Sequence, residues 1–147
     1  PAPPPPPHNT RPWSSAASDV YKRQLILNIQ HDLFNMGAEI SLSQPIIMAE
    51  NVEYLEQQLD HYNEDLPPLK EFILPGGGEA ASLCHIVRAV CRRAERNLVT
   101  LHNEQNTGSE MLAYINRLSD LLFVLARVLT RNAGEKEVYW KAMNKGQ

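Results

Sequence analysis

The sequence is poor in cysteine, in net charge and in long apolar runs, and each shortage excludes a class of protein. Two cysteines among 147 residues, Cys84 and Cys91, are too few for a disulfide-built domain. No run of about 18 apolar residues occurs, so we expect no transmembrane helix and no membrane partner. The formal net charge is −3, whereas proteins that bind nucleic acids are usually basic, so nucleic acid is not an expected partner either. The length indicates a single core.

Several motifs of enzymes and metal proteins are also missing. The glycines at 76–78 are followed by Glu79 and not by the Gly-Lys-Ser/Thr ending of a P-loop. No Glu-x-x-His pair is present, which disfavours a di-iron bundle, and three histidines lack metal-ligand spacing: His31, His85 and His102. The two cysteines lie seven residues apart in a helical stretch, about 10 Å along its axis, so they cannot bridge each other. We interpret them as small packing residues in a reducing compartment and expect no protein-bound metal.

Prolines are concentrated at the start of the chain, where seven of the eleven fall within residues 1–12. Such a run favours polyproline II or disorder, because it lacks backbone donors and buries nothing; a ligand for an aromatic-lined groove is the alternative. The stretch from Ser14 to Gln24 has weak periodicity and resembles adapter-derived sequence joined to an incomplete reading frame. We therefore predict that residues 1–24 are disordered and do not resemble natural sequence of this protein, and that residues 25–147 form a helical domain.

From Leu25 onward, apolar residues recur at helical spacing and no β alternation competes. The first predicted helix, which Pro45 closes, carries Ile26, Ile29, Leu33, Met36 and Ile40, and the second, which Pro67 ends, carries Val52, Leu55, Leu59 and Tyr62. The third, from about Glu79 to Asn103, carries Leu83, Val87, Val90, Ala94, Leu98 and Leu101. The fourth follows the capping-box spacing of Thr107 and Glu110 and carries Met111, Ile115, Leu118, Leu122, Leu125 and Leu129. Short loops between these helices predict an all-α antiparallel helical bundle.

Two polar stripes lie opposite the apolar faces of the last two predicted helices. The stripe on the third helix consists of Arg88, Arg92, Glu95 and Arg96. It is either a solvated face with pairs such as Arg92–Glu95, or an anion site, because arginines on one ridge repel unless an anion neutralises them. Three glycines just before this helix also place free N–H groups where anions bind, which alone is a weak signal.

The stripe on the fourth helix consists of Asn116, Asp120, Phe123 and Arg127. Its aromatic member lies on the side that the apolar ridge leaves to water. A helix with apolar character on both sides is usually buried between neighbours. Phe123 therefore either packs against another helix or subunit, or forms the floor of a ligand pocket.

Four ordered segments carry a resemblance to a known family. They read IQHDLFNMGA at 29–38, FILPGG at 72–77, AVCRRAER at 89–96 and YINRLSDLLF at 114–123. Together they resemble the ATP:cob(I)alamin (corrinoid) adenosyltransferases of the propanediol-utilisation (PduO) type, over essentially Leu25 to Trp140. The resemblance implies a homotrimer of helical bundles with active sites between subunits. It also implies transfer of the 5'-deoxyadenosyl group of ATP to reduced cobalamin, which gives adenosylcobalamin and triphosphate.

The resemblance assigns roles to the two stripes and to the glycine-rich loop. ATP would be held by Arg92, Glu95, Arg96 and Asn116, with Arg92 stabilising the departing triphosphate and Mg²⁺ assisting. No residue would act as acid or base, because Co(I) is itself the nucleophile. Arg88 would serve the subunit interface, and Phe72 with Phe123 would line the corrinoid side. A cobalamin reductase and a cobalamin-dependent enzyme are the implied protein partners, in the cytoplasm of a bacterium or in a mitochondrion.

The start of the chain departs from the family pattern. The family begins with a basic, glycine-containing nucleotide loop of Thr-Gly-Asp type and a further helix, and residues 1–24 match neither. We therefore expect an N-terminally truncated bundle with an exposed apolar stripe. Two alternatives to the enzyme follow: a non-catalytic helical bundle that oligomerises, or a remnant that binds corrinoid without transfer.

Overall fold

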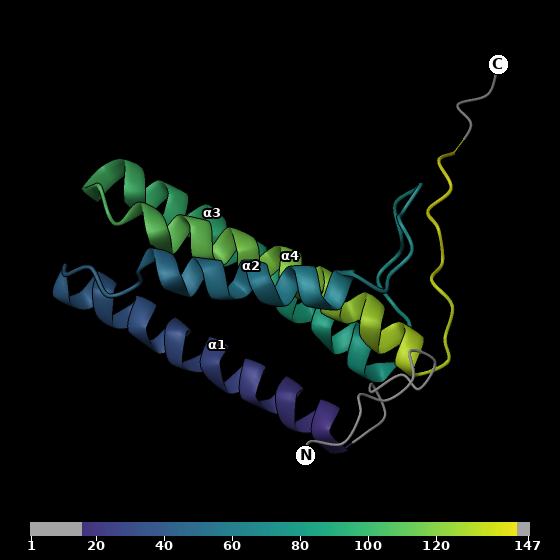
Figure 1. Ribbon diagram of the computed structural model, residues 1–147. Coiled ribbons are helices and arrows are strands. Elements are labelled where there is room, and N and C mark those ends of the chain that lie inside the picture. Colours follow the sequence, from purple (N-terminus) through teal and green to yellow (C-terminus); the bar gives the residue numbers. More distant parts are fainter. Residues whose placement is uncertain (1–15, 144–147) are drawn as a thin grey trace, which may run out of the picture.

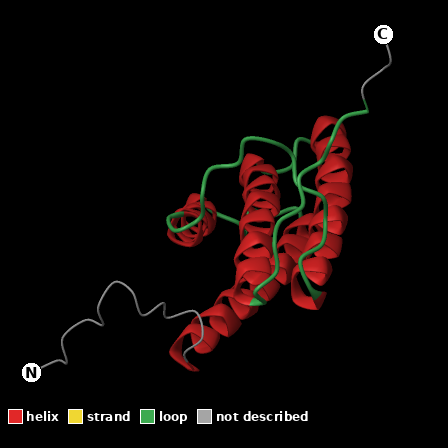
Figure 2. Ribbon diagram, turned by 90° about the vertical axis from the view of Figure 1, so that its right-hand side faces the viewer, coloured by secondary structure: helices red, strands yellow, loops and turns green. Residues whose placement is uncertain are grey.

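Four helices make up most of the computed structural model, which describes residues 16–143 (Figure 1). They are α1 (Ala16–Leu42), α2 (Ala49–Asn63), α3 (Glu79–Gln105) and α4 (Ser109–Asn132). Successive helices run in opposite directions, and the described part contains no strand beyond one isolated bridge (Figures 1 and 2). The predicted all-α antiparallel bundle is therefore confirmed. None of the described helices is both long enough and apolar enough for a membrane span.

Two local predictions about helix starts are wrong. Helix α1 begins at Ala16 and not near Leu25, because the intervening residues are largely good helix formers, so the expected disorder over 16–24 is not found there. Residues 1–15 lie outside the described part, and the domain boundary at residue 25 stays a prediction. At the start of α4 the N-cap is Gly108 without a side-chain cap, so the expected capping box is absent. The carbonyl of Thr107 faces the His102 ring instead, and Glu110 accepts a hydrogen bond from Ser109.

Helix α4 is the centre of the bundle. It packs against α3 and α2, which cover different sides of it. Buried side chains therefore occur all round the helix, including Tyr114, Leu118, Leu121 and Ala126. Apolar character on both sides of this helix thus reflects burial between neighbours, as the sequence pattern indicated.

The apolar stripe of α3 is only partly used for the core. Leu98 is buried, but Leu83, Val87 and Val90 are each about half exposed. They line an apolar cavity of about 540 Å³ that lies between α1, α3 and α4. Helix α1 closes the other side of this cavity, and Figure 1 shows it along the lower edge of the molecule. The first half of this stripe is therefore not core, in agreement with the expected exposed apolar stripe, because α1 does not pack closely on α3.

The two segments outside the bundle lie side by side. The loop between α2 and α3 and the segment after α4 meet at an antiparallel bridge between Ile73 and Tyr139, and Figure 2 shows both as adjacent loops. The Leu74 amide donates to the Val138 carbonyl at 2.8 Å, and the Trp140 amide donates to the Phe72 carbonyl at 2.7 Å. We call these segments the 64–78 loop and the 133–143 segment.

Candidate nucleotide and corrinoid site

The two polar stripes face each other across the α3–α4 contact. Glu95 accepts a hydrogen bond from the Asn116 amide at 3.0 Å, and its other oxygen pairs with Arg92. The Glu95 side chain is mostly buried, whereas that of Arg92 is about half exposed. Glu95 therefore holds Asn116 and Arg92 together, with the guanidinium at the surface. The predicted Arg92–Glu95 pair is present.

A second contact joins the stripes one turn earlier on α3. The Cζ of Arg88 lies 4.9 Å from the centroid of the Phe123 ring, within the range of a cation–π interaction. The ring of His85 meets the same phenylalanine edge-on, with centroids 6.4 Å apart. His85 is buried, and its Nδ1 has no hydrogen-bond partner among the described residues. Burial, and secondarily the charge of Arg88, lower the pKa of His85, so the ring stays neutral near pH 7.

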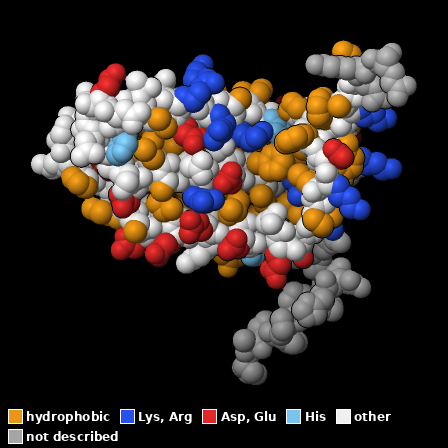
Figure 3. All heavy atoms as spheres, turned by 90° about the horizontal axis from the view of Figure 1, so that it is seen from above, with side chains coloured by type: hydrophobic (Ala, Val, Ile, Leu, Met, Phe, Trp, Pro, Cys, Tyr) orange, Lys and Arg blue, Asp and Glu red, His pale blue; other side chains and the backbone are white. Residues whose placement is uncertain are grey.

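The α3 stripe carries an excess of positive charge at the surface. In the described part, no carboxylate lies within ion-pair distance of Arg88 or Arg96, and Glu95 pairs with Arg92 alone. Figure 3 shows Lys and Arg side chains gathered on this face, beside an apolar area at the end that bears the 64–78 loop. An arginine cluster with one buried carboxylate favours a polyanion such as a triphosphate.

Phe123 borders a cavity. Of the two interpretations of its position, this agrees with the one that places it at a pocket. A cavity of about 480 Å³ lies between the end of α2, the start of the 64–78 loop and α4. Its lining includes Leu59, Asn63, Leu66, Pro67, Phe123 and Arg127. The half-buried ring of Phe123 thus contributes both to packing and to a cavity with a mixed polar and apolar lining.

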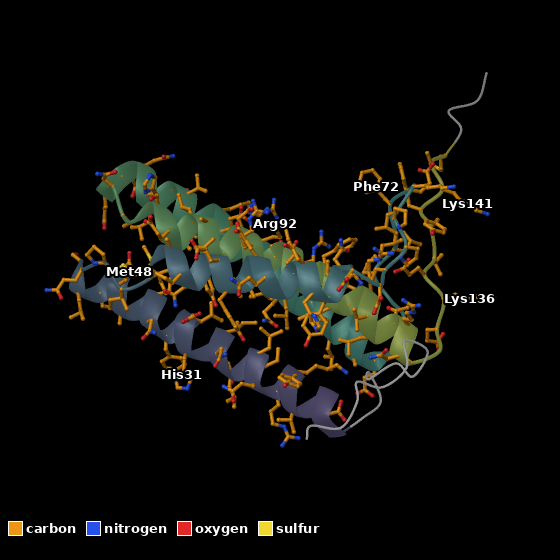
Figure 4. All side chains as sticks on the ribbon, in the orientation of Figure 1. His31, Met48, Phe72, Arg92, Lys136 and Lys141 are labelled. Atoms are coloured by element: carbon orange, nitrogen blue, oxygen red, sulfur yellow. The ribbon has the colours of Figure 1, made fainter. Side chains whose placement is uncertain are left out.

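Phe72 lies apart from Phe123, on the projecting loop. Its side chain is 76% exposed, and its ring meets that of Trp140 in a T-shaped pair with centroids 6.2 Å apart. Figure 4 shows Phe72 beside Lys141 at this end, whereas Arg92 lies on the bundle. Among the described residues, no ring contact joins Phe72 to Phe123. The two aromatic residues expected on the corrinoid side therefore lie on separate elements and do not contact each other.

The sequence analysis assigned no binding role to four residues that take part in contacts around these stripes and loops: His85, Arg127, Glu137 and Trp140. Arg127 is buried and forms an ion pair with Glu137, at 2.6 Å between Nε and Oε1. Its place on the same ridge as Phe123 was the available signal. Glu137 and Trp140 gave none, because they lie beyond the last helix and come to the site only through tertiary structure.

The cysteines are packing residues in the structure, as predicted. Both are free thiols, and they donate to the carbonyls of Leu122 and Ile115 on α4, at 3.1 Å and 3.4 Å. Burial raises the pKa of Cys84 to about 11 and that of Cys91 to about 11. At such pKa values the thiolate is scarce near neutral pH, so neither sulfur is an activated nucleophile.

The fold and the facing stripes define an antiparallel helical bundle, and comparison with known proteins identifies its family. The model of the cobalamin adenosyltransferase family matches residues 12–129, so the chain belongs to this family. A cobalamin adenosyltransferase of Cupriavidus metallidurans is 51% identical over 120 residues, which cover 81% of this chain and 65% of that protein. A corrinoid adenosyltransferase of Bacillus subtilis is 40% identical over 120 residues, or 79% of this chain and 62% of that protein. The chain thus spans less than two thirds of these curated relatives.

Solved structures of a PduO-type adenosyltransferase from Lactobacillus reuteri have the same fold. An arginine-to-lysine variant complexed with ATP superposes with a TM-score of 0.75 at 32% identity, over 84% of this chain and 73% of that one. A phenylalanine-to-alanine variant complexed with cobalamin and ATP superposes with a TM-score of 0.61 at 34% identity, over 67% of this chain and 54% of that one. The family resemblance found in the sequence is therefore confirmed.

Proposed function

We propose that this protein is an ATP:corrinoid adenosyltransferase that makes adenosylcobalamin from ATP and reduced cobalamin. The observation that carries the proposal is the Arg92–Glu95–Asn116 network, which presents a guanidinium at the surface beside two arginines without carboxylate partners among the described residues. Family membership and the ATP and cobalamin of the similar structures support it.

The family resemblance suggests nucleotide roles for the members of this network. Arg92 and Arg96 bind the phosphates of ATP, and Arg92 stabilises the charge that develops on the leaving triphosphate. Asn116 faces the nucleotide, and Glu95 holds Asn116 and Arg92 in place through its two oxygens. Mg²⁺ arrives with the phosphates. Within residues 16–143, no three His, Cys, Asp or Glu side chains gather as a metal site, so the ion depends mainly on phosphate and water ligands.

The corrinoid roles fall to the aromatic residues. Phe72 and Phe123 provide apolar surface on the corrinoid side, where water and the lower axial ligand of cobalt are excluded. Co(I) attacks C5' of ATP, the Co–C bond forms, and the C5'–O bond breaks with its electron pair leaving on the triphosphate. The protein needs no general base for this step, and its contribution is alignment of the two substrates and stabilisation of the triphosphate.

Assembly and location complete the proposal. Arg88 lies at the surface with its positive charge unneutralised by a carboxylate of the described chain, which suits a contact with an acidic group of another subunit. We place it at the interface of a homotrimer. Two free thiols agree with a reducing, cytoplasmic location, with a cobalamin reductase and a cobalamin-dependent enzyme as functional partners.

An anaerobic transfer assay tests this function. The protein is mixed with chemically reduced cobalamin, ATP and Mg²⁺, and the light-sensitive spectrum of the alkylcobalamin product is followed. Product above a control without protein is the expected result. Cobalamin binding without product, measured on folded protein by equilibrium dialysis, would replace the enzyme by a corrinoid-binding bundle. Absence of both activities would favour a helical oligomerisation module.

A further inference from the structure

Arg127 connects helix α4 to both segments outside the bundle. Its side chain is only 4% exposed. Its Nε donates to Glu137 Oε1 at 2.6 Å, and its Nη2 donates to Glu137 Oε2 at 3.4 Å and to the Pro67 carbonyl at 2.8 Å. Pro67 belongs to the 64–78 loop and Glu137 to the 133–143 segment. One buried guanidinium therefore fixes both segments to the same helix.

The same two segments carry the aromatic pair of Phe72 and Trp140. Backbone hydrogen bonds hold the segments in antiparallel register at these residues, and the two rings meet at an interplanar angle of 68°. Both side chains are largely open to solvent, at 76% for Phe72 and 48% for Trp140. Two aromatic rings exposed side by side form an apolar surface whose partner is absent from the described chain.

The aromatic pair of Phe72 and Trp140 receives little packing support from the helical bundle. A cavity of about 180 Å³ lies between the paired segments and the helices, lined by Ile73, Gly77, His85, Thr130, Lys136 and Val138. The exposed side chains of Leu74 and Val138 add little buried area nearby. Gly77 of the 64–78 loop packs closely on Thr130 of α4, but the rest of this lining leaves a cavity, so the polar links beneath the segments also fix their position. Arg127 provides the buried ones.

We propose that Trp140 is a corrinoid-binding residue that acts together with Phe72, and that Arg127 is the positioning residue for this aromatic pair. The inference rests on the proposed function and extends it to residues in the 133–143 segment. A corrin ring is broad and flat, so its apolar surface suits two adjacent aromatic side chains better than one. The alternative ligand for an exposed indole is the adenine base, and ATP affinity distinguishes the two.

The test compares four variants of the full chain. Trp140→Ala removes the second ring, and Arg127→Met keeps an unbranched apolar stem but removes the donors of the guanidinium. The matched control is Arg131→Met, because Arg131 lies one turn further along α4 and donates only to the Asp65 carbonyl, at 2.7 Å. Equilibrium dialysis measures the Kd of cobalamin and, separately, the Kd of ATP. Quenching of Trp140 fluorescence by acrylamide, in a Trp13→Phe background, reports the position of the indole without any ligand.

We expect Trp140→Ala and Arg127→Met to weaken cobalamin binding about tenfold, with ATP binding changed less than about twofold. Arg127→Met is also expected to increase acrylamide quenching, whereas Arg131→Met changes none of the three readouts. Glu137→Gln, which retains an acceptor for Arg127, should give a smaller loss than Arg127→Met.

Three results would overturn the inference in different ways. Unchanged cobalamin affinity in Trp140→Ala, with a parent protein that binds cobalamin, removes Trp140 from the site and leaves the proposed function standing. A loss of ATP affinity instead assigns the indole to the nucleotide. A parent protein that binds no cobalamin refutes both the inference and the proposed function, while the acrylamide result still decides whether Arg127 positions the indole.

Discussion

The guanidinium of Arg88 lies over the ring of Phe123, with 4.9 Å between Cζ and the ring centroid. An arginine above an aromatic face gains about 0.5–1 kcal/mol at a surface position. The contact joins two stripes that the sequence shows on different helices, and it places a cation at the edge of an apolar surface. In the proposed function Arg88 belongs to the subunit interface and Phe123 to the corrinoid side, so this contact would join the two.

Replacement of Arg92 by alanine is expected to impair adenosyl transfer far more than folding. The variant loses a phosphate ligand, so we expect the KM for ATP to rise at least tenfold or kcat to fall by a similar factor. Each tenfold change corresponds to about 1.4 kcal/mol of lost transition-state stabilisation. Because the Arg92 side chain is about half exposed, its pair with Glu95 contributes only about 0–1 kcal/mol to stability. The transfer assay and urea denaturation measure the two effects.

The matched control for this experiment is Arg93→Ala. Arg93 is the exposed neighbour on the same helix, and it has no role in the proposed site. Equal turnover of Arg92→Ala and the parent protein would count against the phosphate role. Equal losses in both arginine variants would show a general effect of surface charge.

Phe72→Ala should chiefly affect the activation of Co(II). The exposed ring excludes water and the lower axial ligand in the proposed site, and loss of that ligand eases reduction to Co(I). We expect a drop of about tenfold or more when the assay starts from Co(II) and a smaller drop when it starts from chemically prepared Co(I). The Kd of ATP should not change. Equal activity of variant and parent from Co(II) would refute this role.

Gly77→Ala is expected to destabilise the protein by about 1–3 kcal/mol. The residue has a positive φ of 98°, and a Cβ there would overlap the side chain of Thr130 on α4. Both effects oppose any residue but glycine at this position. Urea denaturation of Gly77→Ala is compared with Gly76→Ala, where a Cβ would meet nothing within 4 Å. Similar stability of the two variants would show that the loop rearranges without cost.

The stability of the protein should decrease in mild acid partly through His85. Its pKa is lowered by burial and then by Arg88, from the ordinary value of 6.5. The unfolded chain therefore takes up this proton at a higher pH than the folded chain. The contribution of His85 to stability is thus complete above about pH 6.5 and is lost as the pH falls below that value.

Denaturation of His85→Gln between about pH 7.5 and pH 5 measures this contribution. We expect a weaker dependence of the unfolding free energy on pH in this variant than in the parent protein. His31→Gln, at an exposed position on α1, is the control and should keep the parental slope. An identical slope in His85→Gln would show that another group is responsible.

Alkylation of the cysteines should be slow in the folded protein. With the pKa of Cys84 and of Cys91 raised to about 11, the thiolate fraction at pH 8 is roughly 0.1%. Iodoacetamide labelling followed by mass spectrometry should therefore show much faster modification in urea than in buffer. Rapid labelling of the folded chain would indicate that α3 opens away from α4.

Much of the fold could be predicted from the sequence because apolar spacing is a local property. The stripe from Met111 to Leu129 indicated a helix, and the second apolar side of that helix indicated burial between neighbours. For Leu83, Val87 and Val90, the spacing identified an apolar face without showing whether another helix covers it. The capping box predicted at Thr107 is absent because α4 begins one residue later than that box requires, with Gly108 as its N-cap.

The candidate site was predicted in part. Arg92, Glu95 and Asn116 were identified from two stripes, and the structure brings them into one network. Their roles in binding ATP remain predictions. Trp140 and Glu137 had no periodic signal, because residues beyond a last helix follow no helical repeat.

By itself, the sequence determined the helical class, the family and the residue types that can bind a triphosphate, because helical periodicity and ordered motifs depend only on neighbours along the chain. The tertiary structure alone decided which of these residues meet. It brought Arg88 over Phe123, buried Arg127 against Glu137 and set Phe72 beside Trp140. The two members of each pair are brought together by the packing of helices and loops, and a local sequence pattern does not show which distant residues will meet.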